Sequence, residues 1–591
     1  MTKKTHLLRK FKLLPAFGLL LFPTLIPTNM HADSTMLSQK WAGFGVSDDY
    51  WAHTGAWLGP IHVKHAPWNF SSSFNSWLFL QEDRVDDDGG WLFLPRPDYI
   101  DESLPSRDFA VENTVTHTFQ EGYNWNSCTL GRPQWWWPEN ETFGGRIYSD
   151  DDWARYFDLW KWSGSENAGP IRLGFNLFYW EADKGNPTPE SPEMLKLYLF
   201  LDHMKERNMQ VYIANWDFSG LDWLETEHDL PATTEGRQAF AESIAGLCYH
   251  LRVTRGYTNV VGVSLANEPD GIYGTWEHNH YASYLWPIYG MLDSELRDLG
   301  IRDEIRIYGP DTTWHGHDWL VRNVVANVNN YGTYIDVFSD HLYRMDLPER
   351  TGLWRIDSFG ELHEALSDIY GYEFPVIIAE FGPSGPSGQG SLTEEQELVV
   401  YRHMVKQASQ IVIYGLNRGL SGFQRWQFAY DGYLKFAGIT ANDPHYWFKP
   451  YGPVYYPHAV LARYVEAGWK VYRSNGDSGL DQFVNAAVLR CPDGIELSVL
   501  LANEGGERTV VNIDLSELSG VPDSLNRVFV SDKWSGLRDG GKVDFSDGTG
   551  RLVLPPESIT TLTTLPLGNL SAPMEYALQR IRPRTTDSPA K

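Results

Sequence analysis

The chain has 591 residues, of which 42% are hydrophobic and 14% aromatic, and its formal net charge is −27. This length exceeds that of one ordinary hydrophobic core and predicts two or more domains. The acidity argues against a nucleic-acid partner, because phosphate binding requires a basic face. Three widely separated cysteines, Cys128, Cys248 and Cys491, lack metal-ligand spacing and allow at most one disulfide.

Residues 1–32 have the pattern of a secretory leader. Five basic residues precede an apolar stretch over residues 13–26, and Met30-His31-Ala32 offers a cleavage point. Pro15 and Pro23 interrupt this stretch, which is too short to span a membrane. We therefore expect an exported protein, secreted or periplasmic, without membrane association once the leader is removed. Its net charge would then be −32, because the leader carries five basic residues and no acidic one.

From Trp41 onward, short apolar strands alternate with amphipathic helices, a pattern typical of parallel βαβ units. The predicted strands are residues 43–46, 171–175, 209–214, 260–263, 305–308, 335–338, 375–379 and 422–426. Helices are predicted at residues 153–162, 193–207, 235–252, 281–299 and 394–415. This α/β pattern predicts a (β/α)₈ TIM barrel over residues 33–454, with a long insertion at about residues 52–149 between its first two strands.

After residue 455 the pattern changes to short β-rich segments with period-two alternation. These segments are residues 485–489, 497–501, 509–513 and 559–562, with Gly and Asp between them. They predict a small antiparallel β-sandwich domain over residues 455–570. The domain is interpreted as a structural module, with carbohydrate binding as the alternative. Residues 571–591 are predicted to form a disordered tail.

Polar and aromatic residues at the ends of the predicted strands are the candidate functional residues, because a barrel's active site lies at the carboxyl ends of its strands. The candidates are Arg172 after the second strand, Asn215 and Trp216 after the third, Asn267 and Glu268 after the fourth, His341 and Tyr343 after the sixth, Glu380 after the seventh and Trp426 at the eighth. Glu268 and Glu380 would face each other across the barrel mouth, and facing carboxylates cleave glycosidic bonds. One must be protonated and the other ionised, and Arg172 and Tyr343 are suitable neighbours for the ionised group.

The abundance of aromatic residues, with 25 Trp and 31 Tyr, also suits a carbohydrate ligand. Trp and Tyr present a flat apolar face with a polar tip, which fits the C–H faces of sugar rings as well as a protein core. The segment Gly131-Arg132-Pro133-Gln134-Trp135-Trp136-Trp137-Pro138 is therefore either a sugar platform or part of loop packing. Single candidates also have structural explanations: Glu268 as part of a helix start, His341 as a core histidine and Trp426 as core packing. Their joint occurrence at successive strand ends favours a functional site.

The chain from about Trp41 to Pro450 resembles the clan A glycoside hydrolases, which are retaining enzymes built on a (β/α)₈ barrel. Residues 263–269, VSLANEP, look like the acid/base strand of that clan, and residues 376–382, VIIAEFG, look like its nucleophile strand. His341-Leu342-Tyr343 is similar to the His-x-Tyr motif of family 5 and its relatives. The resemblance implies the following roles: Glu268 as acid/base, Glu380 as nucleophile, Asn267 as hydrogen-bond partner of the sugar 2-hydroxyl, Tyr343 oriented on Glu380, Arg172 as support for the nucleophile, and Trp426 as floor of the sugar subsite.

Two departures leave the family within the clan open. Asn215-Trp216 stands where many family 5 members have a His pair or His-Asn. The trailing β-domain, especially residues 554–562, looks more like the sandwich of families 30, 39 and 51.

These features predict a secreted retaining β-glycoside hydrolase that acts on a β-linked polysaccharide or oligosaccharide by double displacement. The chemistry requires no cofactor and no metal. The acidic run at residues 86–90 lacks the spaced ligands of a calcium loop, and a zinc site of His315, His317 and His341 is less favoured than a sugar subsite. The alternative is a non-catalytic carbohydrate-binding protein, which the presence of both glutamates disfavours. The residues do not distinguish the sugar, its linkage or endo from exo action.

Overall fold

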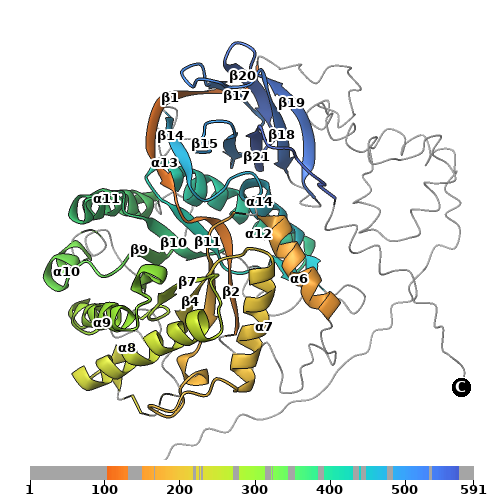
Figure 1. The fold of residues 1–591 in the computed structure, drawn as a ribbon. Coiled ribbons are helices and arrows are strands. Elements are labelled where there is room, and N and C mark those ends of the chain that lie inside the picture. The colour runs from red at the N-terminus through yellow and green to blue at the C-terminus, as the bar shows by residue number, and fades with distance from the viewer. Residues whose placement is uncertain are drawn as a thin grey trace, which may run out of the picture.

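The structure, a computed structural model, shows two packed lobes (Figure 1). It describes residues 103–130, 150–164, 167–216, 221–269 without 222, 225, 228 and 229, 278–312, 321, 324–343, 353–383, 392–429, 435, 438–440, 448–474, 483–531 and 536–571. One lobe is a closed barrel of eight parallel strands, and the other is a nine-stranded sheet. The predicted (β/α)₈ barrel with an additional β-domain is therefore confirmed.

The barrel strands follow one another around the ring in chain order. They are β2 (Gly122–Leu130), β3 (Ile171–Phe175), β4 (Val211–Asn215), β7 (Val260–Ser264), β8 (Arg306–Thr312), β9 (Val337–His341), β10 (Val376–Phe381) and β11 (Gly422–Arg425). Seven of them match predicted strands. The first does not: residues 43–46 lie outside the described residues, and β2 pairs with both β11 and β3 to close the ring. The prediction of residues 43–46 as the first barrel strand is therefore wrong.

Helices surround the barrel, and several have clear sequence reasons to begin where they do. They are α6 (Asp150–Ser163), α7 (Pro192–Glu206), α8 (Thr234–Tyr249), α9 (His278–Asp298), α10 (Val324–Tyr331), α11 (Leu353–Tyr370), α12 (Glu394–Gln407), α13 (Tyr414–Asn417) and α14 (Gly452–Ala462). The side chain of Ser191 caps α7, and Pro192 occupies its first turn. Thr393 and Gln396 form a capping box at α12. All five predicted barrel helices are present, and the last continues through a π-helical stretch, η6 (Ala408–Ile413).

The β-domain is a mostly antiparallel sheet that folds around its own hydrophobic core. Its strand order is β19 (Arg538–Asp544), β18 (Ser524–Val530), β21 (Ser558–Thr563), β16 (Leu497–Asn503), β15 (Val484–Arg490), β14 (Trp469–Ser474), β1 (Ser106–Phe119), β17 (Thr509–Asp514) and β20 (Thr549–Leu554). The four strands predicted for this domain correspond to β15, β16, β17 and β21.

Strand β1 belongs to the β-domain although it precedes the barrel in the chain. Its second half pairs antiparallel with β14, and residues Ser106–Ala110 pair parallel with β17. The chain thus begins its described part in the β-domain, enters the barrel at β2 and returns after α14. The assignment of this segment to an insertion within the barrel is wrong, because its strand partners lie in the β-domain, at least 350 residues further along the chain.

The two lobes are joined by a hydrophobic cluster to which both contribute, in addition to the core inside the β-domain. Strand β16 shows how this arises, because its side chains alternate between two faces. Val499 and Leu501 belong to the core inside the β-domain, whereas Leu500 and Ala502 belong to the large cluster that also contains the barrel helices. The β-domain is therefore packed against the barrel through buried apolar side chains.

Replacing Leu500 with alanine is expected to lower the free energy of unfolding by about 2–5 kcal/mol, because it leaves a cavity between the lobes. Chemical denaturation would measure this loss. Because apolar side chains of both lobes pack in one cluster, we expect the parent protein and the variant each to unfold in one transition. Ile495→Ala is the control, since Ile495 is 73% exposed and its truncation should leave stability unchanged. Two separate transitions would contradict a shared core.

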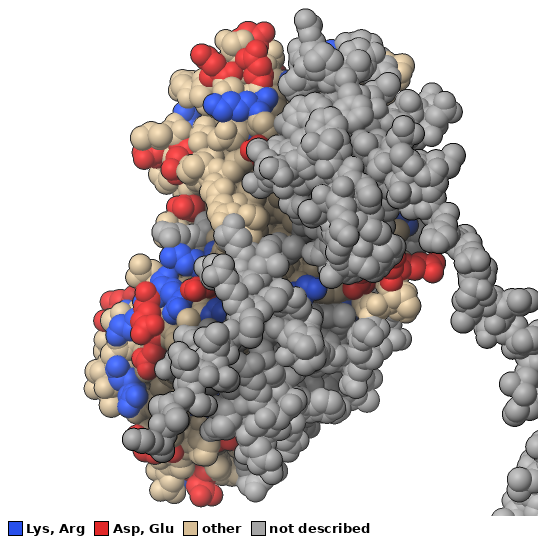
Figure 2. Space-filling view, turned by 90° about the vertical axis from the view of Figure 1, so that its right-hand side faces the viewer, with Lys and Arg blue, Asp and Glu red and all other residues tan. Residues whose placement is uncertain are grey.

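The described surface carries both signs of charge. On the face shown in Figure 2, acidic and basic side chains of the described residues are interspersed, and no large basic area is seen among them. Within the described part of the chain, no helix has the length and apolar character needed to cross a membrane.

Candidate active site

Eight of the nine residues predicted for the site lie at or just beyond the carboxyl ends of barrel strands, whereas Arg172, predicted to follow the second strand, is the second residue of β3. Arg172 lies in β3, Asn215 and His341 end β4 and β9, and Glu380 lies in β10. Trp216, Asn267, Glu268, Tyr343 and Trp426 follow within four residues of a strand end. Because the strands are parallel, their carboxyl ends share one rim of the barrel, so these side chains converge.

Glu380 is a buried carboxylate held by donors on both oxygens. The guanidinium of Arg172 donates from Nη1 to Oε1, and the hydroxyl of Tyr343 donates to Oε2 at 2.9 Å. The pKa of Glu380 is raised, chiefly by burial and also by the charge of Glu268, although His341, Arg172 and the Tyr343 hydrogen bond oppose the rise. Burial also raises the pKa of Tyr343, which therefore remains a donor. Since both contacts donate to the carboxyl oxygens, the geometry suits the ionised form of Glu380.

Glu268 lies opposite Glu380 and is the more exposed of the two, with 23% of its side chain accessible against 4%. Its backbone has a positive φ of 45°, which is costly for a residue with a Cβ and is found at functional sites. A hydrogen bond of 2.9 Å from its amide to the carbonyl of Asp311 holds this conformation. The strained turn directs the carboxylate from the end of β7 into the barrel mouth.

His341 lies between the two glutamates. Its Nδ1 is 3.0 Å from Oε1 of Glu268 and 3.6 Å from Oε2 of Glu380. Burial lowers the pKa of the imidazole, but Glu380 and the hydrogen bond with Glu268 raise it by more. The pKa of His341 is therefore raised overall. One oxygen of each glutamate and a nitrogen of His341 all lie within 4.8 Å of one another.

Arg172 links these groups into one buried network. Its Nη2 donates to Oδ1 of Asn267 at 2.7 Å, and its Nε and Nη2 donate to Oδ2 of Asp311 at 3.2 and 3.0 Å. Burial lowers the pKa of Arg172, but Asp311 and Glu380 raise it well above the usual value, so the guanidinium stays charged. The predicted support of Glu380 by Arg172 thus has a direct geometric counterpart.

Asp311 is a site residue that the sequence reasoning missed. The fifth strand was expected to end at residue 308, but β8 continues to Thr312 and carries Asp311 into the network. The rule that identified the other candidates, a polar side chain at a strand end, would have identified Asp311 had the strand been extended.

Trp216 and Trp426 form an aromatic pair at the same rim. Their ring centroids are 5.2 Å apart with an interplanar angle of 19°, and the guanidinium of Arg172 lies 5.7 Å from the Trp216 ring centroid. Both residues are mostly buried, at 7% and 8% exposed. Stacked indoles next to a polar cluster suit the C–H face of a sugar ring.

Asn215 is placed differently from the other candidates. Its Oδ1 accepts the amide hydrogen of Leu177 at 3.0 Å, and its Nδ2 donates to the carbonyl of Leu265 at 3.2 Å. The side-chain amide of Asn215 therefore links the segment after β3 to the segment after β7. Both polar atoms of the Asn215 side chain thus bind backbone groups, and its contact with a ligand remains a prediction.

The cluster of Glu268, His341 and Glu380 is the one group among the described residues with metal-ligand spacing. The charged guanidinium of Arg172 already contacts Glu380, so a metal ion there would face a second positive charge. The absence of a metal requirement remains a prediction. The acidic run at residues 86–90, His315, His317 and the tryptophans at 135–137 lie outside the described residues.

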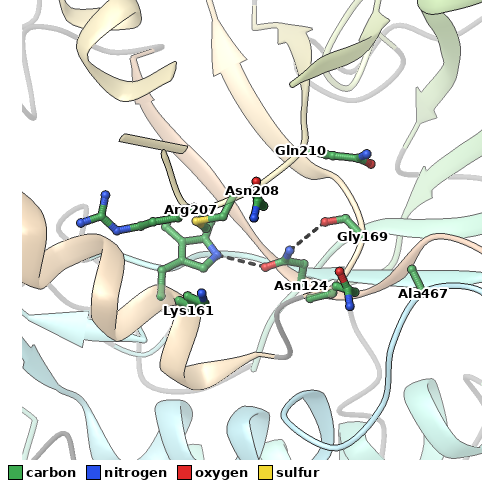
Figure 3. A pocket seen from close by; sticks show the side chains of 11 residues that line it. Asn124, Lys161, Gly169, Arg207, Asn208, Gln210 and Ala467 are labelled. Atoms are coloured by element: carbon green, nitrogen blue, oxygen red, sulfur yellow. Dashed lines mark hydrogen bonds between the residues drawn. The ribbon is translucent and has the colours of Figure 1, made fainter. Parts of the chain in front are cut away.

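A separate cavity of about 180 Å³ lies at the other end of the barrel (Figure 3). Its lining includes Gly169 and Gln210, which immediately precede β3 and β4 and so mark the amino-terminal rim. Asn124 in its wall already donates to the carbonyl of Gly169 at 3.1 Å and accepts from the indole of Trp160 at 3.0 Å. The cavity is thus distinct from the site of the two glutamates.

No protein-family model and no curated protein matches the sequence. Solved structures do match the fold. A conserved exported protein from Bacteroides fragilis aligns with a TM-score of 0.57 and 14% identity over 78% of this chain and 100% of that one. A family 51 α-L-arabinofuranosidase from Thermotoga petrophila RKU-1 aligns with a TM-score of 0.53 and 13% identity over 78% and 100%.

A family 30 endoxylanase from Clostridium papyrosolvens C71 aligns with a TM-score of 0.50 and 13% identity over 77% of this chain and 99% of the enzyme. The chain thus shares the fold of these two glycoside hydrolases, a closed barrel of parallel strands with an additional β-domain. At these identities the likeness concerns the fold, whereas the chemistry must be argued from the site itself.

Proposed function

We propose that the protein is a retaining glycoside hydrolase acting on a β-linked polysaccharide or oligosaccharide, with Glu380 as nucleophile and Glu268 as acid/base. The observation that supports this most directly is the pairing of the two carboxylates across one barrel mouth. An oxygen of each lies within 4.8 Å of the other. Retaining enzymes place these groups about 5–5.5 Å apart, whereas inverting enzymes need about 6.5–9.5 Å to admit a water molecule.

The environments of the two glutamates support this division of roles. Glu380 receives hydrogen bonds from Arg172 and Tyr343, which favour a carboxylate able to attack the anomeric carbon. Glu268 is more exposed and has His341 beside it, which suits exchange of a proton with a leaving group and then with water.

In the first step Glu380 attacks the anomeric carbon while protonated Glu268 donates its proton to the departing glycosidic oxygen. Glu268 then removes a proton from water, which hydrolyses the bond between the sugar and Glu380. Asn267, whose Oδ1 is held by Arg172, presents its amide nitrogen to the sugar 2-hydroxyl, and Trp426 with Trp216 supports the ring. The proposed double displacement is the chemistry of the clan A glycoside hydrolases as a whole, and the proposal does not place the protein in one family of that clan.

The sugar released by the protein is expected to keep the anomeric configuration of the substrate. Proton NMR of the first product, recorded before mutarotation, tests this on a panel of β-glycans and arabinofuranosides. The panel includes xylan and arabinofuranosides because structures of the same fold carry those activities in their names. Inverted product would overturn the nucleophilic role of Glu380, and binding without turnover would favour the non-catalytic alternative.

We also propose that residues 1–32 are removed on export and that the mature protein acts outside the cytoplasm. The leader pattern supports this, as does the name of the Bacteroides fragilis protein of similar fold. N-terminal sequencing of the protein recovered from its producing cells should begin near residue 33.

A further inference from the structure

Asp311 is a third carboxylate beside Glu268 and Glu380, and like Glu380 it is buried. Its side chain is fully buried and accepts hydrogen bonds from three other strands. Arg172 in β3 and the hydroxyl of Ser264 in β7 donate to Oδ2, the latter at 2.7 Å, and the hydroxyl of Ser339 in β9 donates to Oδ1. Each of these side-chain hydrogen bonds thus comes from a strand that carries or precedes a predicted site residue: Arg172 in β3, Glu268 after β7 and His341 in β9.

The guanidinium of Arg172 is divided between two carboxylates. Its Nε and Nη2 face Asp311, whereas its Nη1 faces Glu380. Because a guanidinium is a planar fork with fixed donor directions, fixing one edge fixes the direction of the other. Asp311 therefore determines where Nη1 points.

The backbone of Asp311 has a separate contact with the other catalytic residue. Its carbonyl accepts the amide hydrogen of Glu268 at 2.9 Å, at the residue with the positive φ. Asp311 thus contacts Arg172, which supports the nucleophile Glu380, through its side chain. Through its backbone it contacts Glu268, the acid/base.

We infer that Asp311 is a positioning residue for the reaction: it orients Arg172 towards Glu380 and shares the charge of the guanidinium with that nucleophile. The inference rests on the proposed function. It assigns a task to a carboxylate that does not touch the sugar in the proposed mechanism.

Charge sharing gives the inference a pH signature. Glu380 is faced by Arg172 from β3, by His341 and Tyr343 at β9, and by Glu268 after β7. Asp311 is faced by Arg172 and by the phenols of Tyr212 in β4 and Tyr289 in α9, which remain neutral because burial raises the pKa of both. When Asp311 loses its charge, the whole positive charge of Arg172 acts on Glu380 and lowers the pKa of Glu380.

The test is the dependence of kcat/KM on pH in Asp311→Asn, a variant of nearly the same shape. We expect kcat/KM to fall about 10²-fold, the loss that follows a small misplacement of a catalytic group. The acid limb of the profile, which reports ionisation of the nucleophile in the free enzyme, should move to lower pH. An acid limb at the parent position would overturn the inference and leave Asp311 a structural residue.

Two further variants separate charge from folding. Asp293→Asn removes a carboxylate that Arg297 and Arg302 hold on α9, away from the barrel mouth, and should leave the acid limb unchanged. Ser339→Ala removes one donor to Asp311 but keeps the charge, so we expect a smaller loss of kcat/KM and an unmoved acid limb.

If Asp311→Asn does not fold, the double variant Ser264→Ala with Ser339→Ala loosens the same carboxylate, and unchanged kinetics would overturn the inference. Absence of turnover by the parent protein on all substrates would instead refute the proposed function. If the parent protein turns over substrate and the pH profile of Asp311→Asn matches that of the parent, the positioning role is refuted and the proposed function is not.

Discussion

Replacing Glu380 with alanine is expected to lower turnover by on the order of 10⁵-fold, as loss of the nucleophile does in other covalent mechanisms. The truncation removes the group that would bond to the anomeric carbon. It also leaves Nη1 of Arg172 without its carboxylate while Asp311 still holds the other edge of the guanidinium. The variant therefore contains a cavity with a fixed positive charge, which suits a small anion.

Added azide should occupy that cavity and attack the sugar directly, restoring part of the turnover. Because only one displacement then occurs, the glycosyl azide should have the anomeric configuration opposite to that of the substrate, which NMR can identify. Glu373→Ala is a matched control, since Glu373 precedes the same strand and binds Thr118 at its other end. This control should keep its activity. Azide rescue with retained configuration would show that Glu380 is not the nucleophile.

The two glutamates proposed as catalytic could be predicted from the sequence because each stands at or after the end of a mostly apolar strand. The run over residues 376–381 is buried throughout, and a carboxylate at its end is conspicuous. The run over residues 260–264 that precedes Glu268 is also buried, except for the partly buried Val261. In a parallel barrel, a correct strand end places its polar residue at the mouth without further information.

The first barrel strand could not be predicted in the same way. Strand β2 reads Gly-Tyr-Asn-Trp-Asn-Ser-Cys-Thr-Leu and alternates polar with apolar residues. Its Asn126 is fully buried and donates to the carbonyl of Ala379 beside Glu380. Because β2 supplies polar contacts to the barrel interior, it lacks the apolar run that marks the other strands. Residues 43–46 therefore fit the expected strand pattern better than β2 does.

The place of β1 was hidden for a different reason. Its partners β14 and β17 are distant in sequence, and local periodicity contains no information about which strands pair. The network around Arg172 was partly visible, since Arg172 and Tyr343 were expected near the ionised glutamate. Asp311 was missed because the expected strand ended at residue 308, four residues before the end of β8.

Replacing Glu268 should affect catalysis in a way that depends on the leaving group. A sugar leaving group needs a proton as the glycosidic bond breaks, so Glu268→Ala is expected to lower kcat/KM on an oligosaccharide about 10²–10⁴-fold. An aryl glycoside whose phenol leaves without protonation should lose much less in the first step, and the intermediate on Glu380 should accumulate because no base activates water. Steady-state and burst kinetics on the two substrate types measure this difference.

Azide and a second variant test the assignment further. In Glu268→Ala, azide can enter the space of the lost carboxylate and attack the intermediate on Glu380, so its product should retain the configuration of the substrate, unlike that of Glu380→Ala. Glu268→Gln keeps the shape of the side chain beside His341 but cannot donate a carboxylic proton or admit azide. It should show the same dependence on the leaving group without azide acceleration. Equal losses on both substrate types, or an inverted azide product, would show that Glu268 does not serve as the acid/base and that the roles of the two glutamates must be reassigned.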